Sequence, residues 1–370
     1  MTELFMNIKT SIVYASVFIS SYSMAAPHDL FLTAQSLKTS DKNFELTLAF
    51  DAVNDNIDIF NFREKEGIKD SSAGDYQGFH ITGKYDISPQ WQLEGSFWQR
   101  EIDYSQDTNE LQSYLMALRY TPDFNLDKRD ALSFRASVWG NQSDELSKTT
   151  PTQVKQYTFE KVNVQNPEDL QLQLDAIFSR KLDPMNQLNV YANVGYSKVK
   201  ISQLDIQAMY DNCLMNISVD SNNQYHGNLA NSCKYGKFEL IDLEVGGFAN
   251  EFGLDIQKDL NYDSYYASLG GSWNWRYKNF ESQLAYQYQH IWRNDIDDRV
   301  SQLGNSPIKD NHSLGAKFSY DFSPQVTAFL QAELYKHNMI GQIPLLYNGV
   351  TASRLDKKYG LGTLGVTLRF

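Results

Sequence analysis

The chain has 370 residues, a formal net charge of -12 at pH 7 and a mean hydropathy of -0.48. This acidic balance argues against a nucleic-acid-binding surface, because Lys and Arg supply most of the affinity for phosphates. Aromatic residues make up 14% of the chain and are accompanied by many Gly, Asn, Gln and Ser residues. This composition suits strands and turns better than helices, so we expect an all-β protein.

The first residues have the layout of a secretory signal peptide. Lys9 precedes the apolar and small residues 11–20, and a further small residue follows at Ala25. We expect cleavage after Ala25, so that residues 1–25 form the signal peptide. The alternative is a short membrane anchor, which would need about 18 apolar residues, more than this run contains. Residues 26–42 are then a periplasmic N-terminal segment before the first strand. The alternative is that residues 27–42, which are too short for a plug domain, enter the lumen as a strap.

From residue 43 onward, apolar side chains recur at every second position. In the first such segment, Phe44, Leu46 and Leu48 alternate with Glu45 and Thr47. A period of two is typical of a strand with one apolar face. Segments with this pattern lie at 44–50, 79–85, 91–97, 114–120, 132–138, 170–178, 188–196, 265–273, 284–288, 314–320, 326–334 and 364–370.

Short turns that contain Pro, Asn or Asp alternate along the chain with long polar connections. The long connections lie at 53–75, 142–169, 204–237, 294–310 and 339–356. Transmembrane β-barrels have this asymmetry, with tight turns on the periplasmic side and long loops outside. A soluble β-sandwich is the alternative, but it would rarely collect its long loops on one side. We predict a transmembrane antiparallel β-barrel over residues 43–370.

The number of strands depends on residues 238–260. Twelve strands are clear without this stretch, in which Phe252, Leu254 and Ile256 alternate with polar or small residues such as Asp255. We favour one more hairpin here, which gives about fourteen strands. The alternative is a twelve-stranded barrel in which the stretch belongs to a long extracellular loop. Both counts are even, as in bacterial single-chain barrels.

The chain ends on YGLGTLGVTLRF, in which apolar side chains alternate up to the last residue. This ending resembles the C-terminal signal of Gram-negative outer-membrane β-barrel proteins, with Phe370 last, Leu368 two before it and Tyr359 further up. The resemblance concerns architecture and matches no specific porin subfamily. It implies a porin-like barrel in the outer membrane, expected to be a monomer. Its partners would be outer-membrane lipids and the barrel assembly machinery, which would read Tyr359, Leu368 and Phe370 as the assembly signal.

Two cysteines, Cys213 and Cys233, lie in the same long connection. An exported chain with an even number of cysteines usually pairs them, so we predict a disulfide. A metal pair or a reactive thiol is the alternative, but no His or Cys stands beside them at ligand spacing. No cofactor and no metal are expected.

The polar face of the strands would line the lumen of the barrel. The charged residues assigned to this face are Glu45, Lys84, Glu94, Arg119, Arg135, Asp175, Asp255, Glu281, Lys317 and Glu333. Carboxylates outnumber Lys and Arg in this set, which predicts a modest preference for cations in a pore. The inward aromatic residues Trp98, Trp139 and Tyr191 either stack on a solute or pack the lumen.

Aromatic residues on the apolar face gather near the strand ends. Amphipathic rings at such positions anchor a barrel at the membrane interface. The residues concerned are Tyr120, Tyr196, Tyr265, Trp273, Trp275, Tyr286 and Tyr288.

Catalytic groups are sparse. His312 precedes Ser313, but neighbours in a strand point to opposite faces, which is poor geometry for a base and its nucleophile. Asp295, Asp297 and Asp298 could form a carboxylate site, although such a loop cluster is more often solvated. We therefore do not expect an enzyme.

These observations favour an outer-membrane channel for passive or selective diffusion of small hydrophilic solutes. The first alternative is a non-conducting barrel that binds a surface partner or assists export or assembly. The second is an outer-membrane hydrolase.

Overall fold

The computed structural model describes residues 29–35, 43–53, 76–104, 107–124, 126–149, 152–154, 157–210, 212–235, 237–252, 255–302, 306–336, 343–347 and 358–370. The predicted signal peptide lies outside these residues, as do residues 26–28 and 36–42. In the described part of the chain, no helix is long and apolar enough to cross a membrane.

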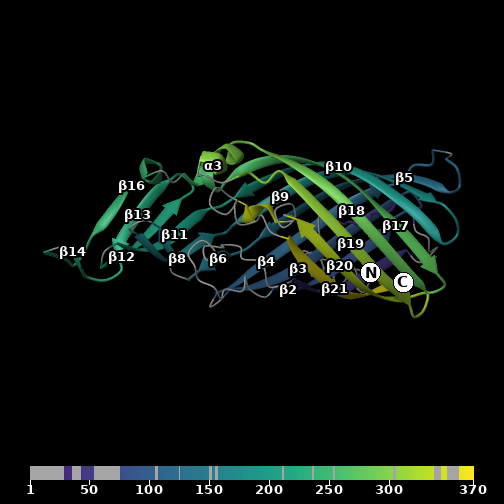
Figure 1. The fold of residues 1–370 in the computed structure, drawn as a ribbon, viewed down its shortest axis with the longest axis horizontal. Helices are drawn as coiled ribbons and strands as arrows, with labels where there is room; N and C mark the ends of the chain where they lie inside the picture. Colours follow the sequence, from purple (N-terminus) through teal and green to yellow (C-terminus); the bar gives the residue numbers. More distant parts are fainter. Residues whose placement is uncertain are drawn as a thin grey trace, which may run out of the picture.

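Twelve strands form a closed antiparallel barrel (Figure 1). They are β1 (Phe44–Val53), β2 (Tyr76–Asp86), β3 (Trp91–Tyr104), β4 (Asp107–Tyr120), β5 (Asp130–Gln142), β9 (Glu168–Lys181), β10 (Asn186–Lys200), β17 (Tyr262–Tyr277), β18 (Phe280–Arg293), β19 (Asp310–Asp321), β20 (Val326–Lys336) and β21 (Lys358–Arg369). The predicted all-β barrel is confirmed with the alternative count of twelve strands. The favoured count of fourteen is wrong.

The last strand closes the barrel against the first. β21 and β1 pair from Arg369 and Glu45 to Leu361 and Val53. The N–H of Phe370 donates to the carbonyl of Phe44 at 2.9 Å, and the ring centroids of these two residues lie 6.0 Å apart. The chain can end on an aromatic residue because the terminal strand completes the wall and leaves the ring on the outer surface, where Phe370 is 60% exposed.

The two ends of the barrel differ in the length of their connections. Residues 87–90, 121–129, 182–185, 278–279 and 322–325 form the connections at one end, where the chain also ends (Figure 1). We call this the turn end. The opposite end, the loop end, carries the long connections between β5 and β9 and between β10 and β17. The predicted alternation of short and long connections is therefore present.

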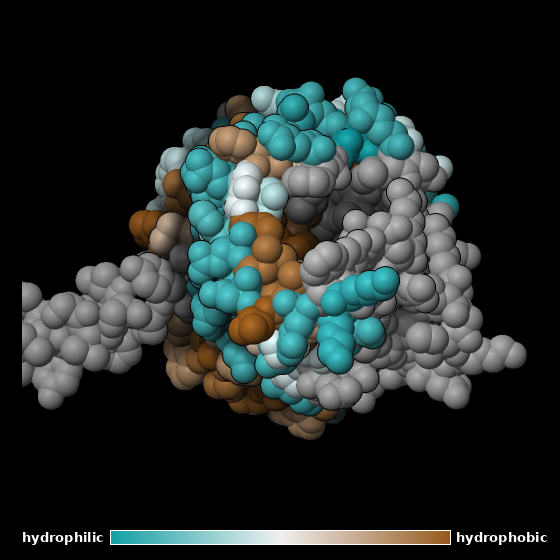
Figure 2. Space-filling view, turned by 90° about the vertical axis from the view of Figure 1, so that its left-hand side faces the viewer, coloured by the Kyte–Doolittle hydropathy of each residue, from teal (hydrophilic) through white to brown (hydrophobic). Residues whose placement is uncertain are grey.

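A second sheet extends from the loop end, on the left in Figure 1. We call it the outer sheet, and it consists of β6 (Glu145–Lys148), β7 (Thr152–Val154), β8 (Tyr157–Gln165), β11 (Gln203–Tyr210), β12 (Cys213–Asp220), β13 (Gln224–Leu229) and β16 (Glu244–Phe248). A hairpin of β14 (Cys233–Tyr235) and β15 (Phe238–Leu240) stands beside it. Seen from this end, the described surface is largely hydrophilic with a strip of hydrophobic residues (Figure 2).

The stretch 238–260 belongs to this outer region and not to the barrel wall. β16 pairs with β13, and η2 (Ala249–Phe252) and α2 (Ile256–Asp259) follow it. The Asp255 carboxylate caps α2 by accepting the N–H of Lys258. The prediction of Asp255 on the inner wall is therefore wrong, because its side chain satisfies the first turn of a helix.

The outer surface of the wall is apolar between charged rims. On β9, Leu170, Leu172 and Leu174 are 47%, 47% and 62% exposed, and the outward series is bounded by Glu168 and Arg180. From the first apolar position to the last, this series spans about 26 Å along the tilted strand at about 3.3 Å per residue. That length is of the order of the apolar band of a transmembrane barrel.

The disulfide between Cys213 and Cys233 is present, which confirms the predicted pairing. It connects β12 to β14 and closes a segment of the outer region with a sequence separation of 20. Both cysteines pack with Leu229, with Met215 and Leu240 against them.

Candidate functional site

A cavity of about 860 Å³ lies inside the barrel. Residues of the connections at the turn end, such as Pro89, Thr121 and Asn279, are part of its lining, so the cavity extends to that end. Eight of the ten charged residues predicted for the inner face line it: Glu45, Lys84, Glu94, Arg119, Arg135, Glu281, Lys317 and Glu333. Asp175 is buried behind Arg135, and Asp255 lies outside the barrel.

One wall of the cavity carries a ladder of ion pairs across four neighbouring strands. Glu94 on β3 lies 2.7 Å from Arg119 on β4 and 2.9 Å from Arg135 on β5. Arg135 also reaches Asp175 on β9 at 3.2 Å. Since inward residues of adjacent strands stand side by side, the two arginines on β4 and β5 are neutralised by the carboxylates of Glu94 and Asp175 on either side.

The opposite wall has ion pairs that the sequence analysis only half identified. Arg276 lies 2.8 Å from Glu281 and also pairs with Asp321. Arg369 lies 2.9 Å from Glu45. Arg276 and Arg369 were missed, although both occupy the polar positions of alternating segments, which is the signal that could have identified them.

The inward aromatic residues pack the lumen. The Trp98 ring stacks on the His80 ring, with the two centroids 4.6 Å apart. The Arg100 guanidinium lies 4.3 Å from the centroid of the Trp98 ring. Trp139 and Tyr191 are each only 1% exposed. The alternative of lumen packing, rather than stacking on a solute, therefore holds for all three predicted rings. His80 in turn contacts the Asp51 carboxylate at 2.7 Å.

Residues 29–35 lie inside the barrel as a strap rather than in the periplasm. The Tyr191 hydroxyl donates to the Leu30 carbonyl at 3.1 Å, and Arg119 donates to the Thr33 carbonyl at 2.7 Å. The N–H of Ala34 donates to the Ser179 hydroxyl at 2.7 Å. The strap thus crosses the inner faces of β4, β9 and β10 at one side of the cavity.

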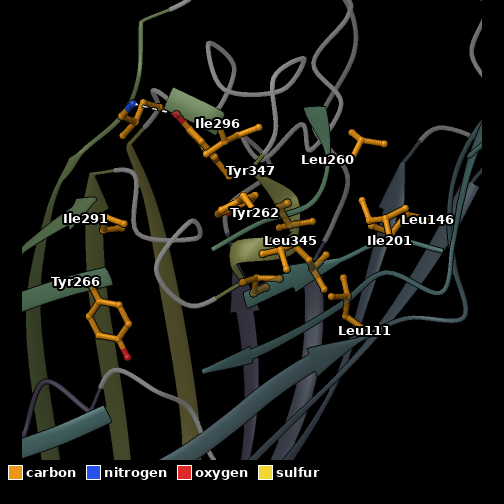
Figure 3. Close-up of a cluster of buried hydrophobic side chains, with 14 of the residues drawn as sticks. Leu111, Leu146, Ile201, Leu260, Tyr262, Tyr266, Ile291, Ile296, Leu345 and Tyr347 are labelled. Carbon is orange, nitrogen blue, oxygen red and sulfur yellow. Dashed lines mark hydrogen bonds between the residues drawn. The ribbon is translucent and has the colours of Figure 1, made fainter. Parts of the chain in front are cut away.

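Toward the loop end the lumen is filled by apolar side chains. Inward residues of the wall, including Leu111 and Ile291, belong to one buried cluster with residues of the outer region, including Leu146 and Leu260 (Figure 3). α3 (Ile296–Gln302) adds Ile296 to this cluster.

The segment Ile343–Tyr347, which includes η3 (Pro344–Leu346), is buried in this cluster and is called the closing segment below. Tyr262 donates to the Pro344 carbonyl at 2.7 Å, and the N–H of Leu345 donates to Asp169 at 3.2 Å. Tyr347 donates to Asp297 at 3.1 Å (Figure 3 shows its surroundings). These contacts fix the segment to β17, β9 and α3.

Tyr347 is the central residue of this closure. The Arg293 guanidinium lies 3.9 Å from its ring centroid, and the N–H of Ile308 points to its hydroxyl at 3.4 Å. Burial, with the nearby Asp297 carboxylate, raises the pKa of Tyr347 to about 12, while Arg293 acts in the opposite direction. The hydroxyl is therefore held in its protonated, hydrogen-bonding form.

The residues considered for catalysis have other surroundings. His312 is on the outer face, 2.8 Å from the Tyr286 hydroxyl, whereas Ser313 is buried on the inner face. Asp297 is not solvated, because it lies 3.5 Å from Arg293 and accepts the Tyr347 hydroxyl. Among the described residues, no group of three His, Cys, Asp or Glu side chains could hold a metal ion.

Several of the predicted interface aromatics are exposed on the outer face of the wall. Tyr265, Trp273 and Tyr286 are 53%, 41% and 47% exposed. The indole N–H of Trp273 donates to Asn186 at 3.1 Å, and Tyr196 donates to Asp263 at 2.9 Å. The rings of Trp273, Tyr196 and Tyr286 are thus apolar on their bodies and hydrogen-bonded at their tips, as anchoring at an interface requires.

No family model and no curated protein matches the chain. Among solved structures, it is similar to the translocator domain of the autotransporter NalP from Neisseria meningitidis, with a TM-score of 0.48 and 8% identity over 90% of this chain and 91% of that one. It is also similar to the NanC porin, with a TM-score of 0.41 and 9% identity over 88% of this chain and 100% of that one. The CymD monoaromatic hydrocarbon channel has a TM-score of 0.40 and 11% identity, with 94% of each chain covered.

At such low identity we take function from the site and not from these similarities. The closed barrel with an apolar outer belt confirms the resemblance to outer-membrane β-barrel proteins that the C-terminal sequence indicated. The role of Leu368 and Phe370 as an assembly signal stays a prediction. The side chain of Tyr359 lies outside the described part of the structure.

Proposed function

We propose that the protein is an outer-membrane channel for small hydrophilic solutes that is closed on its outer side by the segment Ile343–Tyr347. The cavity at the turn end carries this proposal. At about 30 Å³ per molecule it has room for tens of water molecules. Its lining holds charged side chains whose burial without water would be costly. With the turn end in the periplasm, as in known barrels, the cavity is the periplasmic half of a water-filled path.

The nature of the closure supports a channel. The closing segment has five described residues and is held by a few hydrogen bonds and apolar contacts, with polar groups of Tyr262, Asp169 and Asp297 as partners. Because its apolar side chains, such as Leu345 and Leu346, are buried, release of the segment costs several kcal/mol of free energy, and the closed state is the resting one. Departure of the segment would join the cavity to the loop end.

The second candidate is a non-conducting barrel that binds a partner at the cell surface. Two observations favour it: the apolar cluster that fills the loop end of the lumen, and the outer sheet that extends beyond the barrel. In this case the closing segment would be a permanent part of the core.

Conductance through a planar bilayer separates the two candidates. We expect discrete steps from the purified protein, and more frequent or larger steps from a Leu345→Ala, Tyr347→Ala double variant, which loses two side chains of the closure. Ile241→Ala is the matched control, since Ile241 is 76% exposed and far from the closure in the fold. A silent bilayer with both correctly folded proteins would favour the partner-binding barrel.

The structure also revises the expected ion preference. Among the charged residues of the cavity lining, Arg276 and Arg369 are additional cations, and Asp255 no longer counts as a carboxylate. The two signs are then nearly balanced. We therefore expect a cation preference weaker than the sequence alone suggested, measurable as the reversal potential in a salt gradient.

A further inference from the structure

The outer sheet ends in β16 on one side and in β6 on the other (Figure 1). At the β6 edge, the Asn109 side chain of β4 occupies the place of a further strand. The N–H of Ser147 donates to the Asn109 amide oxygen at 2.6 Å, and the Ser147 carbonyl accepts the Asn109 amide N–H at 3.2 Å. Both backbone groups of Ser147 are thus satisfied, and this edge is covered where the sheet meets the barrel.

The β16 edge has no such cover in the described part of the chain. β16 pairs with β13, and no described strand pairs with it on the other side. Backbone groups that bond to a neighbouring strand alternate with groups that point away from it. The N–H of Ala249 donates to the Asn223 carbonyl at 2.8 Å, so Gly247 and Val245 also bond toward β13. The N–H and carbonyl groups of the other residues point away from β13: Glu244, Gly246 and Phe248.

This edge also lacks the features by which natural sheets prevent pairing with another chain. β16 has the sequence EVGGF, without Lys or Pro, and its register against β13 contains no shift. All of its residues except the half-buried Val245 are exposed, and Phe248 is 48% exposed. Gly246 and Gly247 allow another backbone to approach closely. An extended chain can therefore add to the sheet at β16 through main-chain hydrogen bonds.

The charge around the edge indicates which kind of chain would add. From Phe238 to Phe252, every charged residue is an exposed carboxylate: Glu239, Asp242, Glu244 and Glu251. A second copy of this chain would bring the same carboxylates to the interface, and their repulsion would oppose docking. A strand that carries Lys or Arg would instead place an opposite charge beside Glu244. Charge complementarity therefore favours a basic partner over a second copy.

We propose that β16 binds an extended, basic segment of another protein as an additional antiparallel strand of the outer sheet. The added strand would place one residue opposite each of Glu244, Gly246 and Phe248. A Lys or Arg suits the first place, a bulky side chain that covers the glycine suits the second, and an apolar residue suits the third. Docking at β16 is a separate activity from conduction through the barrel and does not depend on it.

Binding of short synthetic peptides to the purified protein in detergent tests this, with fluorescence anisotropy as the measurement. In the basic probe, Thr alternates with Val, Tyr and Lys in that order, so that antiparallel pairing sets Val at Phe248, Tyr at Gly246 and Lys at Glu244. In the acidic probe, Glu replaces Lys. We expect the basic probe to bind at least about fivefold more tightly, because like charges directly opposite one another destabilise strand pairing.

Two variants of Gly246 separate the backbone from the side chain. Gly246→Pro removes the outward N–H, which takes no part in the pairing with β13, and Pro is tolerated at such edge positions. We expect it to weaken the basic probe by at least about tenfold, because a main-chain hydrogen bond is lost and the ring obstructs the added strand.

Gly246→Ala is the matched control, because it keeps the N–H. Both variants place a Cβ 3.3 Å from the Tyr225 carbonyl oxygen, so any strain from the Cβ is common to the two. Binding to the Ala variant should change by less than about twofold. The heat-dependent shift on a gel and resistance to limited proteolysis check that the barrel and the outer sheet of each variant are folded.

The other outcomes would overturn the inference. Equal binding to the Pro and Ala variants, or no binding of either probe to the wild type, would exclude docking at this edge. Equal affinity for the two probes would exclude a basic partner. A dimer of the protein alone that Gly246→Pro abolishes and Gly246→Ala retains, measured by light scattering, would assign the edge to a second copy. All of these measurements are made without a bilayer, so failure of this inference is distinguishable from failure of the channel.

Discussion

Polar and apolar side chains alternate in both the barrel wall and the outer sheet. The apolar side chains face outward in the wall, whereas they face the interior in the outer sheet. In the wall, apolar residues such as Leu174 face outward, and polar residues such as Asp175 face the lumen. In the outer sheet, Leu204 and Val219 are a buried cross-strand pair, while their neighbours Asp205 and Ser218 stand on the opposite face. The two regions therefore bury opposite halves of the same pattern.

Within the single strand β10, the arrangement changes from polar residues facing inward to apolar residues facing inward. Along β10, the inward residues are polar at Asn189 and Asn193 but apolar at Val199, while the outward residues change from Val194 to Lys198. The change falls near Tyr196, one of the predicted interface aromatics. The surrounding solvent therefore decides which face of a strand is apolar. The wall has lipid outside and water inside, whereas the outer sheet has water around an apolar interior.

The largest expected effect concerns the buried ion pairs on the inner face of the wall. Arg135→Ala removes the shared partner of Glu94 and Asp175, and we expect a loss of about 3–5 kcal/mol in the free energy of unfolding. Urea titration in detergent measures it. Lys200→Ala is the control, since Lys200 and Glu168 form an exposed pair at 3.5 Å whose loss should cost less than about 1 kcal/mol. Equal losses in both variants would show that the lumen pairs are fully solvated.

A charged substitution on the exposed face should separate the two regions. Leu174 is 62% exposed in the wall and Ile241 is 76% exposed in the outer region. Leu174→Arg should destabilise the barrel by about 2–4 kcal/mol in lipid vesicles, as for charges near the bilayer midplane. Ile241→Arg should change stability by less than about 0.5 kcal/mol, because its surroundings are water. Similar costs at both positions would contradict the assignment of the belt to lipid.

The wall was predictable from the sequence because its pattern is long and regular. The outward Leu170, Leu172 and Leu174 alternate with Gln171 and Gln173 without a break, and a bilayer outside with polar groups inside requires this order. The same alternation placed the charged residues of the cavity on the inner face. Their ion pairs could not be assigned, because the pairing depends on which strands become neighbours and at what register.

The outer region was harder because its segments are short and their apolar residues are consistent with more than one structure. Phe252 and Ile256 are each two positions from Leu254, which is a strand spacing. They are also four positions from each other, which is a helical spacing. Three apolar residues do not decide between the two. The closing segment has a signal of its own, since Ile343–Tyr347 is an uninterrupted apolar run in a polar connection, but periodicity analysis does not detect such a run.

The disulfide should matter for the outer region alone. Cys213→Ala with Cys233→Ala opens a closed segment with a sequence separation of 20, and we expect a loss of about 3 kcal/mol there. Limited proteolysis should detect faster cleavage of the outer sheet. The heat-dependent gel shift of the barrel should be unchanged, since the wall contains neither cysteine. A parallel change in both would show that the two regions unfold as one unit.

The smallest expected effect is a dependence of the closure on alkaline pH. The pKa of Tyr347 is raised to about 12 from a usual value of 10.0, so the docked state binds the proton more tightly than the released state. Docking is then fully stable below pH 10 and weakens as the pH rises toward 12, by at most about 2.7 kcal/mol at 1.36 kcal/mol per pKa unit. Conductance of the wild type should rise over this range. Tyr347→Phe keeps the ring over which Arg293 lies but cannot ionise, so its conductance should not show this rise. The comparison also isolates Tyr347 from every other group that ionises at high pH, because those groups are the same in both proteins. An equal rise in the two proteins would show that ionisation of other groups releases the closing segment. A flat response in both would show that ionisation of the Tyr347 hydroxyl does not control the closure.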